Sequence, residues 1–408
     1  MNILLINHYA GSKMHGMEYR PYYMSREWVQ MGHQVTIVAA DQSHLRTKNP
    51  VVQDEFTEEW LDGIRYVWLK TPPYEGNGVK RAFNMFSFVG KLYKYKRRII
   101  ELSQPDVVIA SSTYPLDTYP AASIARQTGA KLIFEVHDLW PLSPMVLGGM
   151  SPWHPFIFIM QRGENYAMRT VDGVVSILPK ANLHLVDHGM DPKKYTHIPN
   201  GVDVAEWEGA DQPLPTEHEQ VIRKYKEEGY FLVGYAGSIG PANAMDTLIE
   251  SAPSLKNEKV KFFLVGKGPF KEGLEQRTRE LNVDNVVFLP PIPKATIPDF
   301  LHHMDALYIG AKKDPLYKFG VNPNKLIDYL MAGRPIIHGV EAGNDMVKDS
   351  GSGISIPAEN EEAIGAAVRE LMSMPKEELE KMGANGRRYA LANHDYKKLA
   401  QRFIDAMK

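Results

Sequence analysis

Short apolar runs alternate with amphipathic stretches along the N-terminal half of the chain. The runs have the length of β-strands and occupy residues 2–7, 34–40, 63–69, 106–112, 131–137 and 173–178. Apolar positions recur with helical spacing between most of these runs, as in residues 17–32. Continuous apolar strands separated by helices are typical of a parallel sheet covered on both faces. The pattern therefore predicts βαβ units and a doubly wound α/β domain.

A stretch rich in turn-forming residues, at about 185–205, interrupts this pattern, and a second series of strands then begins. The second series occupies residues 231–237, 260–266, 285–290, 306–310, 335–339 and 353–356. We expect two Rossmann-like domains, residues 1–195 and 196–385, with a ligand cleft between their strand ends. We expect residues 386–408 to form a C-terminal helix that packs back on the first domain.

Composition narrows the class of protein. The chain has 408 residues, enough for two cores, and its net charge of -2 gives no overall bias toward nucleic acid. It has no cysteine, which excludes disulfides and thiolate chemistry and fits a reducing cytoplasm, although other compartments are compatible. The first residues lack the regions of a signal peptide, and no window approaches 18 uninterrupted apolar residues. We expect a cytoplasmic protein without a spanning helix.

The segment "FGVNPNKLIDYLMAGRP" predicts a helix whose N-terminus binds an anion. Asn322 suits the N-cap and Pro323 the first helical position. Gly320 allows close backbone approach, and Lys325 adds a positive charge in the first turn, so phosphate is the natural ligand. Asp328 can accept hydrogen bonds from ribose hydroxyls. The alternative is an ordinary capped helix in which Lys325 and Asp328 form an i,i+3 pair.

Two glycine turns follow other strands of the second domain. "GYAGSIG" places Gly237 at a strand end, and "FFLVGKGPFKEGL" adds Lys267 and Lys271 beside its glycines. The latter is not a dinucleotide fingerprint, because Lys271 stands where the third glycine belongs and no acid follows at the expected distance. Each turn alone is consistent with a purely structural role. Three turns with polar or basic companions in one domain indicate a phosphate-bearing ligand.

The N-terminal domain offers polar residues at the ends of its predicted strands. "EVHD" places His137 and Asp138 at a carboxyl end, the edge where doubly wound sheets bind ligands, although a capped loop is the alternative. Gly16 lies in a loop after the first strand that can admit a phosphate or an acceptor. The nearby polar candidates are His8, Glu18 and Arg20. No spaced His/Asp/Glu cluster appears, so we expect no metal ion and no other cofactor.

The segment 79–100 combines basic and aromatic residues and contains no acid until residue 101. Basic residues occupy positions 80, 81, 91, 94, 96, 97 and 98, and aromatic residues positions 83, 86, 88, 93 and 95. Such a helix can lie on an anionic membrane surface. The alternative is a solvated helix that packs its aromatic residues on the domain. RNA binding lacks any supporting motif. The apolar residues 150–160 belong either to the same face or to the core.

The order of motifs along nearly the whole chain resembles the family 4 glycosyltransferases. The motifs are "NHYAG", "EVHDLW", "HIPNGVD", "GYAGSIG", "FLVGKGP", "VVFLPPIPKATIPDFL" and "PNKLIDYLMAGRPII". The resemblance implies the α/β GT-B fold, with two facing Rossmann-like domains and an interdomain cleft, and sugar transfer from a nucleotide-sugar with retention. Within the family, the chain is most similar to bacterial transferases of N-acetylated deoxysugars, such as N-acetylfucosamine, in surface-polysaccharide assembly.

The resemblance implies a role for each candidate residue. Asp328 would hold the ribose, Ile292 would lie near the base, and His137 would contact the donor sugar. The donor-binding candidates are Gly16, Gly237, Ser238, Lys267, Lys271, Ile292, Gly320, Val321, Asn322, Asn324, Lys325 and Asp328. The catalytic candidates are His137 and Asp138, and the acceptor-side candidates in the N-terminal domain are His8, Glu18 and Arg20.

The chain departs from the family pattern at charged positions. Many members have an acid, seven intervening residues and then a glutamate; here the second acid corresponds to Asp328, but the first position is Gly320. Many members carry an arginine and a lysine after the "GYAG" glycine, where this chain has Ser238 and Asn243. The phosphate charge must then be met otherwise, by Lys325, Lys271 or Lys267.

We therefore predict a metal-independent, retaining glycosyltransferase of the hexosyl type. The donor would be a UDP-sugar with an N-acetylated amino or deoxyamino sugar, and the acceptor a lipid-linked or other glycan at the cytoplasmic face of the membrane. Residues 79–100 would contact the anionic membrane, and nucleic acid is not expected as a partner. A UDP-sugar 2-epimerase of the same architecture and a non-catalytic nucleotide-sugar-binding scaffold are the alternatives.

Overall fold

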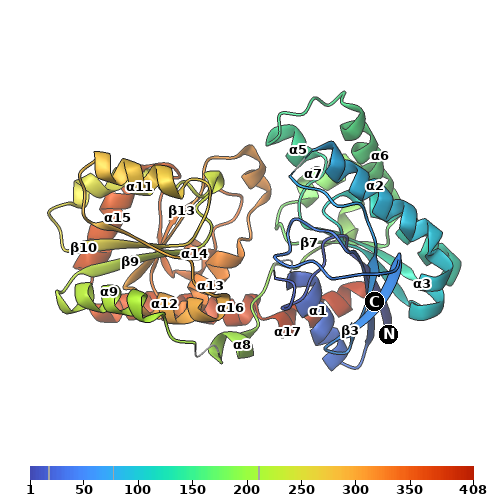
Figure 1. Ribbon diagram of the computed structural model, residues 1–408, viewed down its shortest axis with the longest axis horizontal. Helices are drawn as coiled ribbons and strands as arrows, with labels where there is room; N and C mark the ends of the chain where they lie inside the picture. The colour runs from blue at the N-terminus through green and yellow to red at the C-terminus, as the bar shows by residue number, and fades with distance from the viewer. Residues whose placement is uncertain (17–18, 77, 210–211) are drawn as a thin grey trace. The chain divides into compact units, whose positions relative to one another are not determined.

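The computed structural model, which describes residues 1–16, 19–76, 78–209 and 212–408, contains two compact units (Figure 1). The first unit consists of residues 1–200 and 396–408, and the second of residues 201–395. The boundaries expected from the sequence, at 195 and 385, lie before these. Both units are α/β with parallel sheets, as the sequence predicts. No helix within the described residues is long and apolar enough to cross a membrane.

The first unit is built on an eight-stranded sheet in which every neighbouring pair is parallel except β3 and β4. In sheet order the strands are β3 (Phe56–Leu61), β4 (Ile64–Leu69), β2 (Gln34–Ala40), β1 (Asn2–Ile6), β5 (Val107–Ala110), β6 (Lys131–Val136), β7 (Gly173–Ser176) and β8 (Tyr195–His197). The strand order reverses between β1 and β5. Ligands of doubly wound sheets bind at the carboxyl ends beside such a reversal.

Two of these strands were not predicted from the sequence. β3 forms an antiparallel hairpin with β4, and after the buried Phe56 its residues alternate between half-buried and exposed positions, so it lacks a continuous apolar run. Its turn carries a recognisable signal, because Asp62 and Gly63 both have positive φ (50° and 78°), as an Asp-Gly hairpin turn requires. β8 has only three residues.

Helices cover both faces of this sheet, and the C-terminal helix returns to it. The helices are α1 (Tyr19–Gln30), α2 (Val79–Lys94), α3 (Lys96–Ser103), α4 (Thr118–Thr128), α5 (Leu142–Val146), α6 (Pro155–Thr170), α7 (Asn182–Asp187) and α17 (Tyr396–Met407). α17 lies beside α1 (Figure 1), with Phe403 edge-on to Trp28 at 5.2 Å and Tyr396 stacked on Tyr23 at 4.9 Å between ring centres. The Trp28 indole also donates to the Ala400 carbonyl at 3.2 Å. Aromatic packing thus fixes the end of the chain to the first unit.

The second unit is built on a six-stranded, all-parallel sheet. In sheet order the strands are β11 (Val286–Leu289), β10 (Val260–Val265), β9 (Phe231–Ala236), β12 (Ala306–Gly310), β13 (Ile336–Gly339) and β14 (Gly353–Ser355). The strand order reverses between β9 and β12, so the carboxyl end of β9 lies at the expected ligand edge.

Helices bury both faces of this sheet, which explains its unbroken apolar strands. One face is covered by α8 (Val204–Glu208), α9 (Thr216–Glu227), α12 (Ile297–His303), α13 (Asn324–Ala332), α14 (Met346–Ser350) and α16 (Lys376–Asn393). The other face is covered by α10 (Met245–Ser251), α11 (Lys271–Glu280) and α15 (Glu361–Ser373). Along β10, Phe263 and Val265 pack into the first core and Phe262 and Leu264 into the second.

Candidate functional site

Lys325, in the first turn of α13, places its ammonium at the carboxyl end of β9. Its Nζ donates to the Tyr235 hydroxyl at 2.6 Å and to Asn243 Oδ1 at 3.1 Å, and lies 4.1 Å from the centre of the Tyr235 ring. A Cβ at Gly237 would lie 2.6 Å from Lys325 Cε, so a larger residue here would displace the lysine from this position. The structure thus brings two predicted residues together, and the lysine points to Tyr235 and Asn243 and not along the helix to Asp328.

The electrostatics of this lysine are unusual for a cation. Burial lowers the Lys325 pKa to about 7. Burial also raises the pKa of Tyr235, so the phenol stays neutral and provides no countercharge. The phenol instead donates to the Ser238 carbonyl at 2.5 Å. A half-buried cation with neutral partners, at the start of a helix, is an environment that favours an incoming anion.

The start of α13 differs from the sequence prediction. Asn322 as N-cap was wrong: the helix begins at Asn324, with Pro323 as its N-cap in an extended conformation and without a side-chain cap. The preceding loop is instead held by Asn344, whose side chain accepts from the Val321 N–H at 2.8 Å and donates to the Val321 carbonyl at 3.0 Å. Sequence reasoning missed Asn344, which follows β13 and carries no local signal for this contact.

Close packing explains the glycines of the two other turns. Ile239 N donates to the Lys267 carbonyl at 3.0 Å, and Gly237 N donates to the Val265 carbonyl at 3.0 Å. A Cβ at Gly268 would collide with the Ile239 carbonyl oxygen. The glycines of these two turns therefore have a structural function, whether or not the turns also bind a ligand. The predicted side chains of Ser238 and Lys267 are exposed there, whereas Lys271 Nζ lies 3.4 Å from the Leu289 carbonyl and 3.9 Å from Glu275.

Asp328 lies farther along α13 and is half-buried. Burial raises its pKa to about 6, and the Lys294 charge and the nearby Trp207 indole act in the opposite direction. Lys294 follows closely after Ile292, which packs against the same core as α13, so the predicted base-binding loop ends near the predicted ribose acid. Asn324 is exposed at the helix start. The donor-binding roles of these residues stay predictions.

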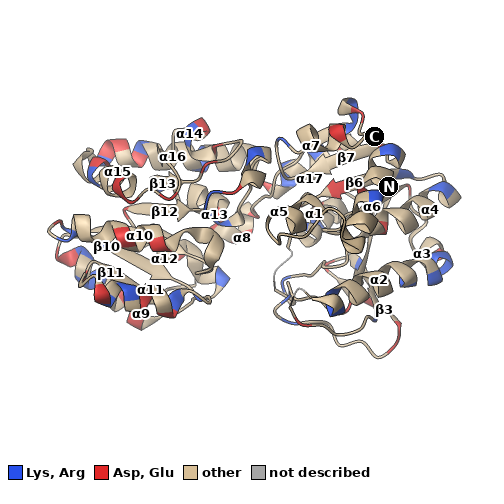
Figure 2. Cartoon of the chain, turned by 90° about the horizontal axis from the view of Figure 1, so that it is seen from above, with Lys and Arg blue, Asp and Glu red and all other residues tan. Residues whose placement is uncertain are grey.

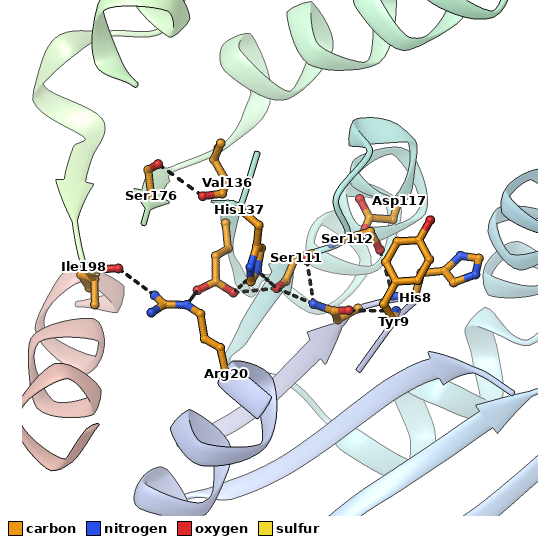
Figure 3. Close-up of polar contacts among 12 residues, drawn as sticks. His8, Tyr9, Arg20, Ser111, Ser112, Asp117, Val136, His137, Ser176 and Ile198 are labelled. Carbon is orange, nitrogen blue, oxygen red and sulfur yellow. Dashed lines mark hydrogen bonds and ion pairs between the residues drawn. The ribbon is translucent and has the colours of Figure 1, made fainter. Parts of the chain in front are cut away.

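In the first unit, a chain of polar contacts joins α1 to the ends of β5 and β6 (Figure 3). Glu135 accepts from Arg20 Nε at 2.9 Å and from Ser111 Oγ at 2.6 Å, and His137 Nε2 lies 3.2 Å from it. Burial alone would raise the Glu135 pKa, but the Arg20 charge and the contacts of His137 and Ser111 hold it well below its ordinary value. Arg20 also donates to the carbonyls of Pro199 and Ile198 at 2.5 and 2.9 Å.

These contacts fix the orientation of the His137 ring. Its Nε2 lies 3.0 Å from Ser111 Oγ, whose own proton goes to Glu135, and the Glu135 carboxylate only accepts. Nε2 must therefore carry a proton, which leaves Nδ1 of the neutral ring as an acceptor. Among the described contacts Nδ1 makes none, and the side chain is 15% exposed. The ring can accept a hydrogen bond from a sugar hydroxyl through this atom.

The other candidates of this unit have structural contacts. Asp138 accepts from Leu139 N at 2.9 Å and Ser143 Oγ at 2.6 Å, which is the capped-loop alternative. His8 is fully buried beside Tyr114, and burial lowers its pKa well below the ordinary value. A Cβ at Gly16 would collide with the Thr47 hydroxyl. Glu18 lies outside the described residues.

Sequence reasoning missed Glu135 and Ser111, although one signal was available. Glu135 is an acid inside the apolar strand "KLIFEV", and a buried carboxylate needs a partner. Arg20 is that partner and is itself 5% exposed, so its contacts favour a positioning function. Its predicted acceptor-side role stays a prediction.

Residues 79–100 form most of two helices, α2 and α3, which meet at Tyr95. Basic residues stand out on both helices in Figure 2. Acids from the β3 region compensate part of this charge, because Lys91 and Lys94 contact Glu55, and Arg98 contacts Glu58 at 3.2 Å. At the N-terminal end of α2, in contrast, apolar side chains are exposed: Val79 (73%), Phe83 (66%) and Phe86 (40%).

Known proteins are similar to this chain over nearly its whole length. A protein of Escherichia coli K12 named as a colanic acid biosynthesis glycosyl transferase, WcaI, is 21% identical over 393 residues, which cover 94% of each chain. Sucrose-phosphate synthase from Thermosynechococcus elongatus has a TM-score of 0.73 at 15% identity and covers 99% of this chain and 97% of its own.

A second solved structure carries a nucleotide. Anabaena HepE in complex with UDP has a TM-score of 0.67 at 14% identity, with coverage of 100% of this chain and 99% of HepE. HepE has also been solved in complex with UDP-glucose, at a TM-score of 0.62 and 12% identity, covering 99% of this chain and 98% of HepE.

Two family models divide the chain between them. Residues 15–201 match the family described as "Glycosyl transferase 4-like domain", and residues 217–389 match "Glycosyl transferases group 1". The first match lies almost wholly within the first unit and the second within the second. The resemblance inferred from the motifs is confirmed, and the chain belongs to the family 4 glycosyltransferases with the GT-B fold.

Proposed function

We propose that this enzyme transfers an N-acetylated amino or deoxyamino sugar, with retention, from a UDP-sugar to a lipid-linked or glycan acceptor in surface-polysaccharide biosynthesis. Retention and the N-acetylated sugar rest on the family resemblance. The name of WcaI, which refers to colanic acid, supports the polysaccharide product. The complexes of HepE with UDP and UDP-glucose support the uridine nucleotide.

Lys325 is the observation that carries the proposal. Its ammonium lies between the start of α13 and the end of β9, with neutral partners and a pKa lowered to about 7 by burial. A diphosphate would supply the missing countercharge. Sugar transfer leaves negative charge on the departing nucleoside diphosphate, and a preorganised cation with helix N–H groups stabilises charge where it develops. The protein would thus assist departure of the leaving group without a metal ion and without an enzyme nucleophile.

A donor panel with product analysis tests this function. Free UDP and UDP-N-acetylhexosamines should raise the thermal unfolding midpoint of the full chain more than GDP-sugars do, because a ligand that binds the folded state stabilises it. Labelled sugar should then pass to a lipid-linked glycan with its anomeric configuration retained. Interconversion of UDP-sugars without an acceptor would identify the 2-epimerase alternative. UDP-sugar binding without turnover on any lipid-linked or free glycan in the panel would support the non-catalytic nucleotide-sugar-binding scaffold.

The enzyme would bind its acceptor while the first unit contacts an anionic membrane surface. The exposed Val79, Phe83 and Phe86 on α2, next to the basic residues of the same segment, support this part of the proposal. Apolar insertion would contribute more than the basic residues, because Lys94 and Arg98 already contact acids of the protein.

Vesicle sedimentation separates the two contributions. Phe83→Ser with Phe86→Ser should lower binding to vesicles of anionic phospholipid, whereas Lys94→Gln with Arg98→Gln should lower it less. Phe270→Ser, which alters a side chain of the second unit that is 46% exposed, is the matched control and should leave binding unchanged. Equal sedimentation of the double phenylalanine variant and the parent would exclude this surface.

A further inference from the structure

Two histidines and a glutamate converge between the helices that precede and follow β7. Glu164 lies on α6, and His184 and His188 are one turn apart at α7. His184 Nε2 lies 2.9 Å from Glu164 Oε1, and His188 Nε2 lies 3.9 Å from Glu164 Oε2. One nitrogen from each ring and one carboxylate oxygen all lie within 4.8 Å of one another. The glutamate and His184 are 20 residues apart, so the sequence alone did not suggest the cluster.

The hydrogen bonds of His188 determine which of its nitrogens faces the carboxylate as an acceptor. His188 Nδ1 lies 2.9 Å from the His184 carbonyl, which only accepts, so Nδ1 carries a proton. Nε2 is then the nitrogen that remains for a further partner. It faces Glu164 Oε2 at 3.9 Å, a distance too long for a hydrogen bond. A cation between these two atoms could contact both.

Burial and the outer contacts strengthen this interpretation. The Glu164 side chain is 2% exposed and that of His184 is 9% exposed, and the ion pairs that the structure shows for Glu164 are with these two histidines. Gln161 Nε2 donates to Glu164 Oε2 at 2.7 Å, and the His184 carbonyl orients His188. Metal ligands are commonly oriented by such outer hydrogen bonds.

We propose that Glu164, His184 and His188 bind a divalent transition-metal ion, with Zn²⁺ as the ion that fits best. Two imidazoles and one carboxylate are borderline ligands of the kind that Zn²⁺ accepts, and a fourth position remains for water. The ion would link α6 to α7 on either side of β7 and stabilise the first unit. It is separate from the donor-binding residues of the second unit, so the inference does not depend on the donor or the reaction.

Metal titration of the untagged, full-length protein tests the site, because a histidine tag would bind the same ions. After removal of metal with a chelator, Co²⁺ should bind with a stoichiometry of one and give the visible absorption of a site with nitrogen ligands. Zn²⁺ should displace it and raise the thermal unfolding midpoint. Absence of stoichiometric binding by the parent protein overturns the proposal.

Variants assign the ligands. Glu164→Gln and His188→Ala should each weaken Zn²⁺ binding by more than about tenfold and abolish the rise in midpoint. The His188 side chain is 27% exposed, so its removal should leave the fold intact, and circular dichroism checks this. His303→Ala is the matched control, because His303 also lies on a carboxylate, Asp299, at 3.5 Å, but outside the cluster. Unchanged binding in His188→Ala, or an equal loss in His303→Ala, overturns the assignment.

Discussion

The two units share a doubly wound fold but differ in how they treat a charge near their strand ends. In the first unit, Arg20 and Glu135 neutralise each other at 2.9 Å, and the Glu135 pKa is held low. In the second unit, Lys325 has neutral partners, and burial lowers its pKa to about 7. A paired buried charge positions neighbouring groups, here His137. A half-buried charge with neutral partners, here Lys325, indicates where the ligand brings the opposite charge.

Breaking the Arg20–Glu135 ion pair of the first unit should have the strongest effect on the protein, through its stability. Glu135→Gln leaves the Arg20 charge buried without its counterion and should destabilise the first unit by about 3–5 kcal/mol. Five of the six tryptophans, at positions 28, 60, 68, 140 and 153, belong to this unit, so tryptophan fluorescence during denaturation reports mainly on it.

Glu250→Gln is the matched control for this experiment. Glu250 pairs with Arg277 at 2.6 Å, but both side chains are at least 35% exposed, and exposed pairs contribute little to stability. Its unfolding midpoint should stay close to that of the parent. If the two variants unfold alike, the Arg20–Glu135 pair is no more than a surface contact in energetic terms, and the comparison between the units fails.

Lys325, whose described partners are neutral, should contribute to donor binding. Lys325→Met should weaken UDP-sugar binding by about 1–3 kcal/mol, because a charge-assisted contact to the diphosphate is lost. Lys376→Met is the matched control: Lys376 also lies in the first turn of a helix that follows a proline, but it is exposed and lies 3.6 Å from Glu380. Calorimetric titration measures the UDP-sugar affinity of both variants. An unchanged UDP-sugar affinity in Lys325→Met would indicate that the start of α13 is an ordinary helix end and does not bind the diphosphate.

The sequence predicted these two regions unequally. All strands of the second sheet, six of the eight strands of the first sheet and the Lys325–Gly237 neighbourhood follow from local signals: apolar runs, a glycine at a strand end and a lysine in a first turn. The contacts of Tyr235 and Asn243 with Lys325, and of Asn344 with Val321, join segments far apart in the chain. Local periodicity cannot report them. The Arg20–Glu135 pair has a partial signal, because an acid within an apolar strand demands a partner but does not identify it.

The affinity for the UDP-sugar should depend on pH through Lys325. With a pKa of about 7, Lys325 loses its proton in the free protein as pH rises, whereas a bound diphosphate favours the protonated form. Binding above pH 7 must then take up a proton, so UDP-sugar affinity should fall about tenfold for each further pH unit. A UDP-sugar is the suitable ligand, since its doubly esterified diphosphate does not titrate in this range. Lys325→Arg, which stays charged, should remove the slope, and a slope that persists would assign the titration to another group.

Removal of the His137 ring should have a weaker effect, and it tests whether the Arg20–Glu135 pair positions this ring. His137→Ala removes the ring that Glu135 and Ser111 orient and should lower donor kcat/KM about three- to tenfold, the loss of one neutral hydrogen bond, while UDP affinity stays unchanged. His137→Gln retains an N–H donor toward Ser111 and a separate acceptor, so it should recover part of the activity. Asp138→Asn, which alters only the loop-capping carboxylate, is the matched control and should turn over like the parent. An equal loss of UDP affinity and turnover in His137→Ala would mean that the polar chain supports the strand ends in general and does not orient a group toward the sugar.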